Sequence, residues 1–513
     1  MPSVRVRTVV SVTLAAVLLA GTGFAFGRRS ADQGYQLYQD VLQLVSQEAV
    51  DSLSPDSLYT MSARGLVQVL DDPYSELFNR RDYENFSRNA LGNRYGGIGL
   101  RIVRVRDTVQ AFRIIPGGPA EAAGIRRGDR IVRIADSAAI GWTTDRVANA
   151  LTGTPGTTVD VALARRGSAQ PYQVRLTRAI ITVSVVPFTS LLPGSIGYIP
   201  IQRFSDHSAA DVAGAIQDLQ ARGATSYLLD LRGNPGGSLD QAVAMTNLFI
   251  DAGRPVVSVR GRHTDDTLRG GSPPLLAPST PIAVLVDSNT ASASEILSGA
   301  LQDYDRALIV GTNTFGKGVV QGAYPLPDGW VLKLTTARWF TPLGRPLQRT
   351  RADSAREVRP TYRTFGGRTI LGGGGVVPDV IVYADTLSST AMSLNRLLNT
   401  RASVVNGVLD NFAADMEDTV RSNFSVMPAW RDTLLSRLRA AGLLLPESLD
   451  TSATGYLNRV IEASVGSLVL SDSEQFARRQ PHDQQLARAL ELLRGRHTQA
   501  DLLAAAVRSR QGD

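Results

Sequence analysis

A serine and a lysine that lie 25 residues apart carry the clearest chemical signal in this sequence. Of the 54 lysine and arginine residues in the 513-residue chain, only Lys317 and Lys333 are lysine. Arginine serves wherever a fixed positive charge is enough, but only lysine can lose its proton and act as a neutral base. Lys317 follows the run Thr290-Ala-Ser-Ala-Ser-Glu295, which offers Ser292 as a nucleophile. The pair predicts a hydrolase in which a lysine activates a serine.

Ser292 stands where a strand should end and a helix should begin. The segment Val284-Leu-Val-Asp-Ser-Asn-Thr-Ala-Ser292 indicates a strand, a short turn and a helix start. A serine on the first helical turn has its hydroxyl at the positive end of the helix dipole, and the next amide is available to an oxyanion. Ser292 and Ser294 are about 200° apart around a helix, so only one of them can face a cleft. Either serine could be a simple helix cap, and the serine pair alone does not decide.

A lysine base needs surroundings that make its neutral form common. A free lysine, with a pKa near 10.4, is neutral in about one molecule in a few thousand at pH 7, and desolvation can lower that pKa by about 3 to 5 units. Phe315-Gly316 and Gly318-Val-Val supply apolar neighbours for Lys317, and Gln321 can hydrogen-bond to the amine. Lys333 alternates within a predicted strand, so we expect a structural or surface charge there.

A glycine-rich loop offers donors for a developing oxyanion. The run Leu229-Asp-Leu-Arg-Gly-Asn-Pro-Gly-Gly237 predicts a strand that enters a loop and then a helix. Such a loop, at the carboxyl end of a sheet strand, exposes unpaired amides beside a helix N-terminus. The loss of one oxyanion donor typically costs about 3 to 4 kcal/mol.

Two other catalytic patterns are weaker. A Ser-His-Asp arrangement would have to use His263, in a polar loop, because the other three histidines lie at a helix start or in the helical C-terminal region: His207, His482 and His497. The run Gly311-x-x-x-x-Gly316-Lys317 is nearly a phosphate-binding P-loop, but Gly318 replaces the hydroxyl residue that would hold magnesium, and a strand pattern follows. We expect no nucleotide, no metal and no other cofactor.

Composition excludes several classes of function. The chain has no cysteine, which excludes disulfides, thiolate zinc sites, a cysteine nucleophile and a lipid-modified cysteine. The formal charge is +7, but the arginines are scattered and no run of five basic residues occurs, which argues against nucleic-acid binding. The apolar stretch from Val9 to Phe26, between arginines, predicts a signal peptide or an uncleaved signal anchor over residues 1–29. We expect an exported protein, either periplasmic or held at the inner membrane and facing the extracytoplasmic side.

The pattern along the chain divides it into regions. Residues 30–94 indicate helices, residues 95–182 indicate mostly strands, and residues 183–385 alternate strand and helix, with a hairpin signal at Pro327-Asp-Gly329. The alternation predicts a mixed or parallel sheet flanked by helices. Residues 386–513 are helical in pattern, ending in a predicted helix from Leu486 to Val507.

The region 95–182 carries a peptide-binding signature. Tyr95-Gly-Gly-Ile-Gly-Leu100 places three glycines on a turn that enters an apolar strand, where bare amides can converge on a carboxylate. With Gly124-Ile-Arg-Arg-Gly-Asp129 downstream, the region resembles a PDZ domain. The resemblance implies that a peptide adds as a strand beside Ile98 to Arg101 and that its terminal carboxylate meets the loop Gly96–Gly99. The implied binding residues are Gly96, Gly97, Ile98, Gly99 and Leu100.

Together, these motifs resemble the C-terminal processing, or tail-specific, proteases over residues 35–385. The resemblance implies that Ser292 is the nucleophile, Lys317 the general base and Gln321 the residue that positions the lysine. Amides of Gly237 and Ala293 would form the oxyanion pocket, with Gly236 as the alternative to Gly237. The implied reaction is endoproteolysis near the C-terminus of protein substrates, through an acyl-enzyme. We expect a multidomain α+β fold with N-terminal helices, a PDZ module, a mixed α/β protease core and a helical C-terminal extension.

Two other interpretations of the sequence stay open beside this prediction. The chain could be an exported PDZ scaffold with an inactive protease body, or a hydrolase of the same fold that acts on non-peptide substrates. The presence of nucleophile, base and glycine loop argues against the scaffold, and the PDZ module argues against non-peptide substrates.

Expected partners are proteins or peptides with free C-termini. For the helices of 386–513 three roles stay open: pairing of two copies, binding of an adaptor, or covering of the protease body.

Overall fold

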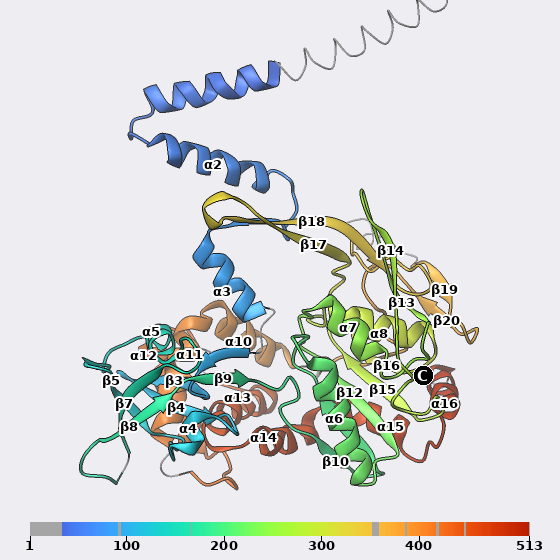
Figure 1. Cartoon of the computed structure of the whole chain (residues 1–513). Coiled ribbons are helices and arrows are strands. Elements are labelled where there is room, and N and C mark those ends of the chain that lie inside the picture. The colour runs from blue at the N-terminus through green and yellow to red at the C-terminus, as the bar shows by residue number, and fades with distance from the viewer. Residues whose placement is uncertain are drawn as a thin grey trace, which may run out of the picture. The chain divides into compact units, whose positions relative to one another are not determined.

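The computed structural model of the chain describes residues 33–90, 94–165, 167–350, 359–384, 387–416, 420–445 and 448–511 (Figure 1). The predicted leader at residues 1–29 lies outside these ranges. Within them, no helix combines the length and the apolar character needed to cross a membrane. The chain divides into two compact units. The first holds the described residues up to Tyr83 together with Gln321–Thr335, and the second holds the rest.

The first unit combines helices with a short antiparallel sheet. One helix covers residues 33–48, and α2 (Pro55–Gln68) follows it, beginning at Ser54, whose hydroxyl accepts the amide of Ser57 at 3.2 Å. Strand β1 (Glu76–Phe78) pairs antiparallel with the first residues of β18 (Val331–Phe340). The helical pattern of residues 30–94 did not predict β1, and α3 (Arg80–Ala90) follows that strand.

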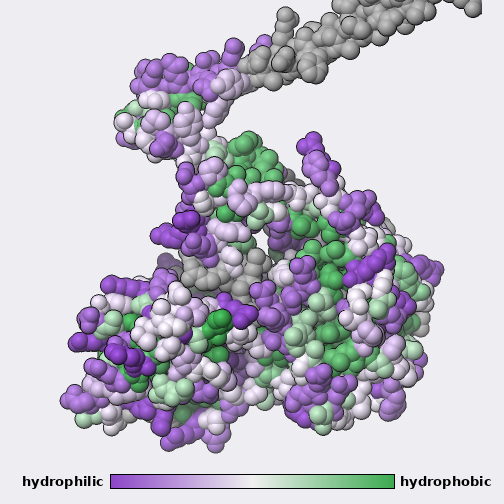
Figure 2. Space-filling view, in the orientation of Figure 1, coloured by the Kyte–Doolittle hydropathy of each residue, from purple (hydrophilic) through white to green (hydrophobic). Residues whose placement is uncertain are grey.

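The predicted hairpin at Pro327-Asp-Gly329 is confirmed. Strand β17 (Val319–Pro325) pairs with β18, and a short 3-10 helix at Pro327–Gly329 joins them. Tyr324 and Leu326 near this turn are 46% and 41% exposed. Figure 2 shows apolar side chains gathered over the hairpin. The hairpin thus presents apolar surface in the first unit.

The β-rich module of the second unit is an antiparallel sheet with two short helices. Strand β2 (Arg94–Gly97) pairs with β9 (Ala179–Thr182). The main sheet and its helices share one apolar core. Its strands, in spatial order, are β3 (Leu100–Val105), β4 (Thr108–Ile114), β5 (Arg130–Ile134), β7 (Thr158–Ala164) and β8 (Tyr172–Thr177), with β6 (Ser137–Ala138) beside β5 and with the helices α4 (Pro119–Ala122) and α5 (Thr144–Leu151).

A six-stranded sheet, called the protease sheet below, forms the centre of the predicted protease core. All neighbouring strands are parallel except the first pair. The alternation of side chains along a strand places Tyr227 and Leu229 in one apolar cluster and Leu228 in another, on opposite faces. The strands, in spatial order, are β10 (Ser190–Leu192), β11 (Ile196–Pro200), β12 (Ser226–Asp230), β15 (Ile282–Val286), β16 (Leu308–Gly311) and β21 (Val380–Ile381).

Helices cover both faces of this sheet. On one face lie α6 (Ser208–Ala221), α7 (Leu239–Thr246) and α8 (Ala293–Asp303). On the other lie α14 (Asp472–Arg479), α15 (Gln484–Leu493) and α16 (Gln499–Gln511), the red helices of Figure 1. The end of the C-terminal extension therefore covers the protease sheet. The predicted helix from Leu486 to Val507 is wrong in one respect, because the chain breaks at Gly495, where φ is +67°.

The remaining helices of the extension form their own core. They are α10 (Ser389–Thr400), α11 (Ala402–Met416), α12 (Pro428–Ala440) and α13 (Thr451–Val469). Val103 and Phe112 of the PDZ-like module pack against this core. Arg127 also donates to the carbonyl of Ser467 at 2.8 Å. The extension therefore contacts the β-rich module as well as the protease sheet.

Three antiparallel strand pairs complete the second unit. Strand β13 (Pro255–Gly261) pairs with β14 (Asp265–Arg269), and β13 also pairs with residues 337–340 of β18. Strand β19 (Thr361–Arg363) pairs with β20 (Thr369–Leu371).

Candidate active site

Ser292 lies on a strained turn between a buried strand and a buried helix. Its backbone has φ 60° and ψ −118°, between β15 and α8. Such a conformation in a residue other than glycine costs about 1–3 kcal/mol and persists only where the surroundings enforce it. The amide of Ser292 donates to Oε2 of Glu295 at 2.8 Å, which helps to hold the turn. A strained strand-to-helix turn of this kind is how many hydrolases present a nucleophilic serine.

Ser294 has a different environment from Ser292. It is fully buried, and its hydroxyl donates to the carbonyl of Asn234 at 3.2 Å. Ser292 is only partly buried. Of the two candidate serines, Ser292 is therefore the one whose side chain is available for chemistry.

The turn before Ser292 is held by one carboxylate. Asp287 Oδ1 accepts the amides of Gly233, Asn289 and Thr290, each at 3.0 Å. The Thr290 hydroxyl in turn donates to the carbonyl of Leu231 at 2.9 Å. These bonds tie the end of β15 to the loop after β12 because Gly233 and Leu231 belong to that loop. The serine turn and the glycine loop are therefore one hydrogen-bonded assembly.

Gly236 and Gly237 make close backbone approaches that a larger residue would block. A Cβ on Gly236 would lie 2.7 Å from the Cβ of Ser292 and 2.8 Å from the amide nitrogen of Ala293. A Cβ on Gly237 would lie 1.9 Å from the carbonyl oxygen of Phe204. Both glycines also have positive φ, +92° and +144°. The sequence requires glycine here so that the loop can lie directly against the serine.

The hydrogen bonds distinguish the two glycines. The Gly236 amide donates to Asn234 Oδ1 at 2.9 Å. Phe204 bonds to the carbonyl of Gly236 and to the amide of Ser238, so the Gly237 amide points away from Phe204 in this parallel bridge. Neither the Gly237 amide nor that of Ala293 makes a hydrogen bond within the described part of the chain. Of the two candidate oxyanion donors of the loop, this arrangement favours Gly237 over Gly236.

Glu295 connects the serine turn to the lysine segment. Its Oε2 accepts the amide of Lys317 at 2.9 Å as well as that of Ser292 at 2.8 Å. Because both nitrogens bind one oxygen, the two main-chain amides lie less than about 6 Å apart, by the geometry of two ordinary hydrogen bonds. Its Oε1 accepts the amide of Gly316 at 2.8 Å and the hydroxyl of Thr314 at 2.5 Å. Residues separated by 25 positions in the sequence are thus brought together at one carboxyl group.

The lysine segment is fixed on both sides of Lys317. Its carbonyl accepts the indole N–H of Trp339 at 2.9 Å, and the amide of Gly318 donates to Gln348 Oε1 at 3.0 Å. Phe315 donates its amide to the carbonyl of Thr290 at 2.9 Å. Trp339 is buried and Lys317 is half-buried. The main chain of the lysine is thus held against the serine turn from several directions.

Burial and hydrogen bonds act on Glu295 in opposite directions. The side chain is fully buried. Burial raises the pKa of its carboxyl above the ordinary value, and hydrogen bonds from four groups act to lower it: those from Thr314, Ser292, Lys317 and Gly316. Three of these groups are main-chain amides, which can only donate, and the fourth is the Thr314 hydroxyl. Its role is therefore to accept hydrogen bonds that hold the two segments together.

Gln321 and Lys333 lie in the first unit. On β17, Gln321 donates through Nε2 to the hydroxyl of Thr335 at 3.3 Å. Lys333 on β18 pairs with Glu76 at 3.3 Å and lies 5.0 Å from the ring centroid of Phe78. The contacts of Lys333 are those of a structural charge, as its position in a strand suggested. The role of Gln321 beside Lys317 stays a prediction.

Histidine and metal sites are absent from the described part of this assembly. His263 lies exposed between β13 and β14, and His207 precedes α6. His482 lies in a short 3-10 helix before α15, and His497 lies between α15 and α16. Among the described residues no group of three or more metal-binding side chains occurs.

Three of the five predicted peptide-binding residues, Gly96, Ile98 and Leu100, line a groove. Gly96 and Gly97 end β2, Ile98 and Gly99 form the turn, and Leu100 begins β3. The groove has a volume of about 1110 Å³; its walls come from this turn, β3, α5 and the segment after β11, and include Tyr95, Gly96, Ile98, Leu100, Ala148, Leu151 and Arg203. Gly97 and Gly99 are outside this lining.

The turn itself suits a carboxylate. A Cβ on Gly96 would lie 2.0 Å from the carbonyl oxygen of Gly153, so only glycine fits there. The amides of Ile98 and Gly99 make no hydrogen bond within the described residues. Two free amides on a glycine turn are a typical anion-binding arrangement.

Comparisons with known proteins assign two regions of the chain to known families. A model of Peptidase family S41 matches residues 195–364, and a model of the PDZ domain matches residues 91–164. A carboxy-terminal-processing protease of Bartonella bacilliformis is 34% identical over 316 residues, which are 61% of this chain and 72% of that protein. The carboxy-terminal processing protease CtpA of Bacillus subtilis is 31% identical over 337 residues, 65% of this chain and 72% of that protein.

The chain belongs to the carboxy-terminal-processing proteases. Among solved structures, the photosystem II D1 C-terminal processing protease is 29% identical, with 70% of this chain and 91% of that chain covered and a TM-score of 0.37. The family predicted from the motifs is confirmed, as are the PDZ domain and the multidomain α+β fold. This protease is of the serine type.

Two residues of the protease site were not predicted. Glu295 belongs to the motif that was recognised, and its spacing from Ser292 is that of a helix capping box, which could have indicated its contact with the serine amide. Arg232 lies in the glycine loop and contacts Asp483, 251 positions further along the chain. No local pattern could have indicated that contact.

Proposed function

We propose that this protease cleaves protein substrates near their C-termini with Ser292 as nucleophile and Lys317 as general base. The observation that carries the proposal is that one buried carboxyl, that of Glu295, binds the main-chain amides of both residues. This arrangement supports a serine and a lysine that act on each other. The half-buried position of Lys317 supports a partly desolvated amine, which is the environment in which a lysine becomes a neutral base.

Acylation follows from these roles. The neutral amine of Lys317 takes the proton of the Ser292 hydroxyl while the serine oxygen attacks the scissile carbonyl. Negative charge develops on the carbonyl oxygen, and the amides of Gly237 and Ala293 donate to it. When the C–N bond breaks, the lysine gives its proton to the leaving amine, and the N-terminal part of the substrate remains on Ser292 as an ester.

Deacylation repeats the same proton transfers. Lys317, neutral again, takes a proton from a water molecule that attacks the ester carbonyl. The tetrahedral intermediate uses the same two amides, and the proton returns to the oxygen of Ser292 as the ester bond breaks. The family resemblance assigns Gln321 to orient the lysine amine, and we retain that role as part of the proposal.

We propose that the PDZ domain selects substrates by their free C-termini. The tail would add as a strand beside β3, with its carboxylate at the amides of Ile98 and Gly99. The apolar groove side chains Leu100 and Leu151 would receive an apolar tail residue. Capture at the PDZ domain raises the local concentration of the substrate at the catalytic residues.

The sequence supports two further proposals, one about the cellular location of the protease and one about the partners of its C-terminal extension. The apolar stretch in residues 1–29 supports export, with the protease either periplasmic or anchored to the inner membrane. The C-terminal extension could also pair two copies of the chain or bind an adaptor. Either role would use the part of the extension that does not cover the protease sheet.

The test uses the purified chain, an unfolded protein substrate and mass spectrometry of the fragments. We expect the wild type to release C-terminal fragments and Ser292→Ala to release none. A substrate whose terminal carboxylate is converted to an amide should be cut more slowly, through a higher KM. The matched control is Ser294→Ala, which should cleave both substrates like the wild type.

Two results would overturn the proposal. Fragment release by Ser292→Ala at the wild-type rate would remove the serine mechanism. Equal KM values for the free and the amidated substrate would separate the PDZ domain from recognition of the tail.

A further inference from the structure

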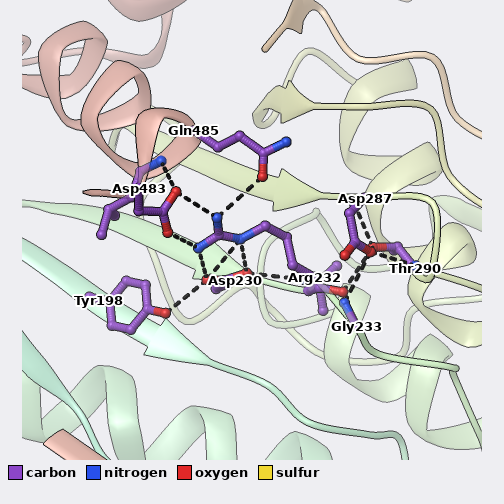
Figure 3. A network of polar contacts seen from close by, with 10 residues as sticks. Tyr198, Asp230, Arg232, Gly233, Asp287, Thr290, Asp483 and Gln485 are labelled. Carbon is purple, nitrogen blue, oxygen red and sulfur yellow. Dashed lines mark hydrogen bonds and ion pairs between the residues drawn. The ribbon is translucent and has the colours of Figure 1, made fainter. Parts of the chain in front are cut away.

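Arg232 of the glycine loop is held by groups from two distant parts of the chain. Its guanidinium makes a forked ion pair with Asp230, at 2.9 Å from Nε and 2.6 Å from Nη2 (Figure 3). On its other side it makes a second forked pair with Asp483, at 2.8 Å from both Nη1 and Nη2. Gln485 Oε1 accepts a further bond from Nη1 at 3.2 Å. Every side of the guanidinium fork thus meets an acceptor.

The network is largely desolvated. The side chains of Arg232, Asp230 and Asp483 are 19%, 9% and 23% exposed. Burial alone would lower the pKa of Arg232, but the two carboxylates more than offset burial and raise that pKa. A paired charge in such a site is costly to leave without its partner. The removal of one carboxylate should therefore displace Arg232 rather than leave it in place.

Arg232 determines the start of the loop that reaches the serine. Its own amide donates to Asp230 Oδ1 at 3.0 Å, so the side chain and main chain of Arg232 close one tight turn. The next residue, Gly233, donates to Asp287, which holds the turn before Ser292. Asn234 follows, and its carbonyl accepts the amide of Ala291 at 3.0 Å. The proposed oxyanion donor Gly237 lies five positions after Arg232.

Two of the groups that hold Arg232, those of Asp483 and Gln485, belong to the last helices of the chain. Asp483 is the N-cap of α15 and accepts the amide of Leu486 at 3.0 Å. In addition, Phe476 of α14 stacks on Tyr198 with 4.2 Å between ring centroids, and the Tyr198 hydroxyl donates to Asp230 at 2.8 Å. These helices lie beyond residues 195–364, the part that the Peptidase family S41 model matches.

We infer that Arg232 is a positioning residue for the oxyanion loop and that the C-terminal helices, through Asp483, hold it in place. This inference rests on the proposed function, because it assigns the loop of Gly237 to the oxyanion. The helical extension is then a functional part of the protease: it sets the geometry that stabilises the transition state. Substrate capture at the PDZ groove does not depend on this network.

The test variant is Asp483→Asn. Asparagine caps a helix about as well as aspartate, so α15 keeps its N-cap while Arg232 loses a charged partner. The matched control is Asp450→Asn, the same change at the N-cap of α13, where the aspartate accepts the amide of Ala453 at 2.7 Å. Both variants, together with wild type and Ser292→Ala, are assayed for kcat and KM on one tail-bearing substrate and for thermal unfolding.

We expect kcat of Asp483→Asn to fall about tenfold to a hundredfold, with KM within about twofold of wild type. Asp450→Asn should keep the wild-type kcat. Arg232→Lys should show the same loss as Asp483→Asn, because a single ammonium cannot fork to both carboxylates. A purely structural role would instead lower the unfolding temperature and leave kcat per folded molecule unchanged.

Two failures are distinguishable. If wild type cleaves, Ser292→Ala does not, and Asp483→Asn and Arg232→Lys both keep the wild-type kcat, the inference about Arg232 is wrong while the proposed function holds. If Ser292→Ala cleaves like wild type, the proposed function is wrong and the inference falls with it.

Discussion

The main-chain amide of Lys317 donates to the same oxygen atom of Glu295 that accepts the amide of Ser292. The lysine segment therefore cannot move away from the serine turn without breaking a buried hydrogen bond. Buried donors that lose their acceptor cost about 1–3 kcal/mol each, so this link is strong for its size. The shared Glu295 oxygen explains how Ser292 and Lys317 are held together although they belong to no common helix or pair of strands.

Glu295→Gln should damage the site more than a change of one atom suggests. A carboxamide has one acceptor oxygen, and its NH2 group would face N–H donors where Glu295 now accepts. We expect a loss of about 1–3 kcal/mol in the free energy of unfolding and a fall in kcat of about tenfold or more. Denaturant unfolding and kinetics on one substrate measure both quantities.

The control for that variant is Glu474→Gln. Glu474 makes the same kind of contact at the start of α14, accepting the amide of Ser471 at 2.7 Å, but on the surface. Its replacement should change neither kcat nor stability by a measurable amount. Equal kcat for Glu295→Gln and Glu474→Gln would show that the shared oxygen does not position the two residues.

Ser294→Ala should separate the two serines of the motif. It removes the hydrogen bond from the Ser294 hydroxyl to the carbonyl of Asn234, at a cost of about 1 kcal/mol in stability. We expect cleavage at the wild-type rate, against complete loss for Ser292→Ala. Measurement of both rates decides which serine is the nucleophile. A folded but inactive Ser294→Ala would contradict the assignment of Ser292.

Replacement of a loop glycine by alanine should lower kcat more at Gly237 than at Gly233. Gly237→Ala places a Cβ 1.9 Å from the carbonyl oxygen of Phe204, so the loop must shift. We expect kcat to fall about a hundredfold, the typical effect of losing an oxyanion donor. Gly233→Ala is the control, because a Cβ there meets nothing within 4 Å and only the positive φ of +70° costs stability. Similar kcat values for the two variants would contradict the assignment of Gly237.

Acid should weaken the PDZ domain through Asp129. This side chain is 1% exposed. Burial alone would raise the pKa of its carboxyl, but hydrogen bonds from Arg165, Tyr172 and the amide of Arg126 bring it below its ordinary value. A lowered pKa means that the stabilisation is present above the unfolded-state value near 3.8 and disappears as the pH falls through the lower folded-state value.

The measurement compares thermal unfolding of wild type and Asp129→Asn from pH 7 down to pH 3. We expect the variant to unfold at lower temperature at pH 7 and the difference to shrink below about pH 4, since the carboxyl then becomes protonated in the unfolded chain and, at still lower pH, in the folded protein. Asp160→Asn, which removes an exposed pair with Arg175, should have little effect at any pH. A constant difference across the range would show that the charge of Asp129 is not what stabilises the domain.

The sequence predicted those parts of the site that depend on local pattern. Lys317, the serine motif and the glycine loop each have a recognisable context. The PDZ turn was predicted from its glycines and the positive φ that they allow, which Gly99 adopts, whereas the close approach of Gly96 to the carbonyl of Gly153 needed the structure. The choice between Ser292 and Ser294 needed the structure, because it depends on which hydroxyl is buried against Asn234.

The parts that were not predicted depend on contacts between distant segments. The pairing of β1 with β18 joins Glu76 to Lys333 across more than half the chain, and a three-residue strand has no periodicity to detect. The contact of Arg232 with Asp483 and the packing of α14–α16 on the protease sheet likewise join segments that are far apart in the sequence. Helical periodicity indicated that these helices have an apolar face but not which surface that face would cover.

The most direct test of the account compares the only two lysines of the chain. Lys317→Arg keeps a positive charge but removes the group that can become neutral, whereas Lys333→Arg keeps the ion pair with Glu76. We expect kcat/KM of Lys317→Arg to fall by about a thousandfold or more, with tail-peptide binding unchanged, and Lys333→Arg to match wild type. Turnover by folded Lys317→Arg within about tenfold of wild type would contradict a lysine base.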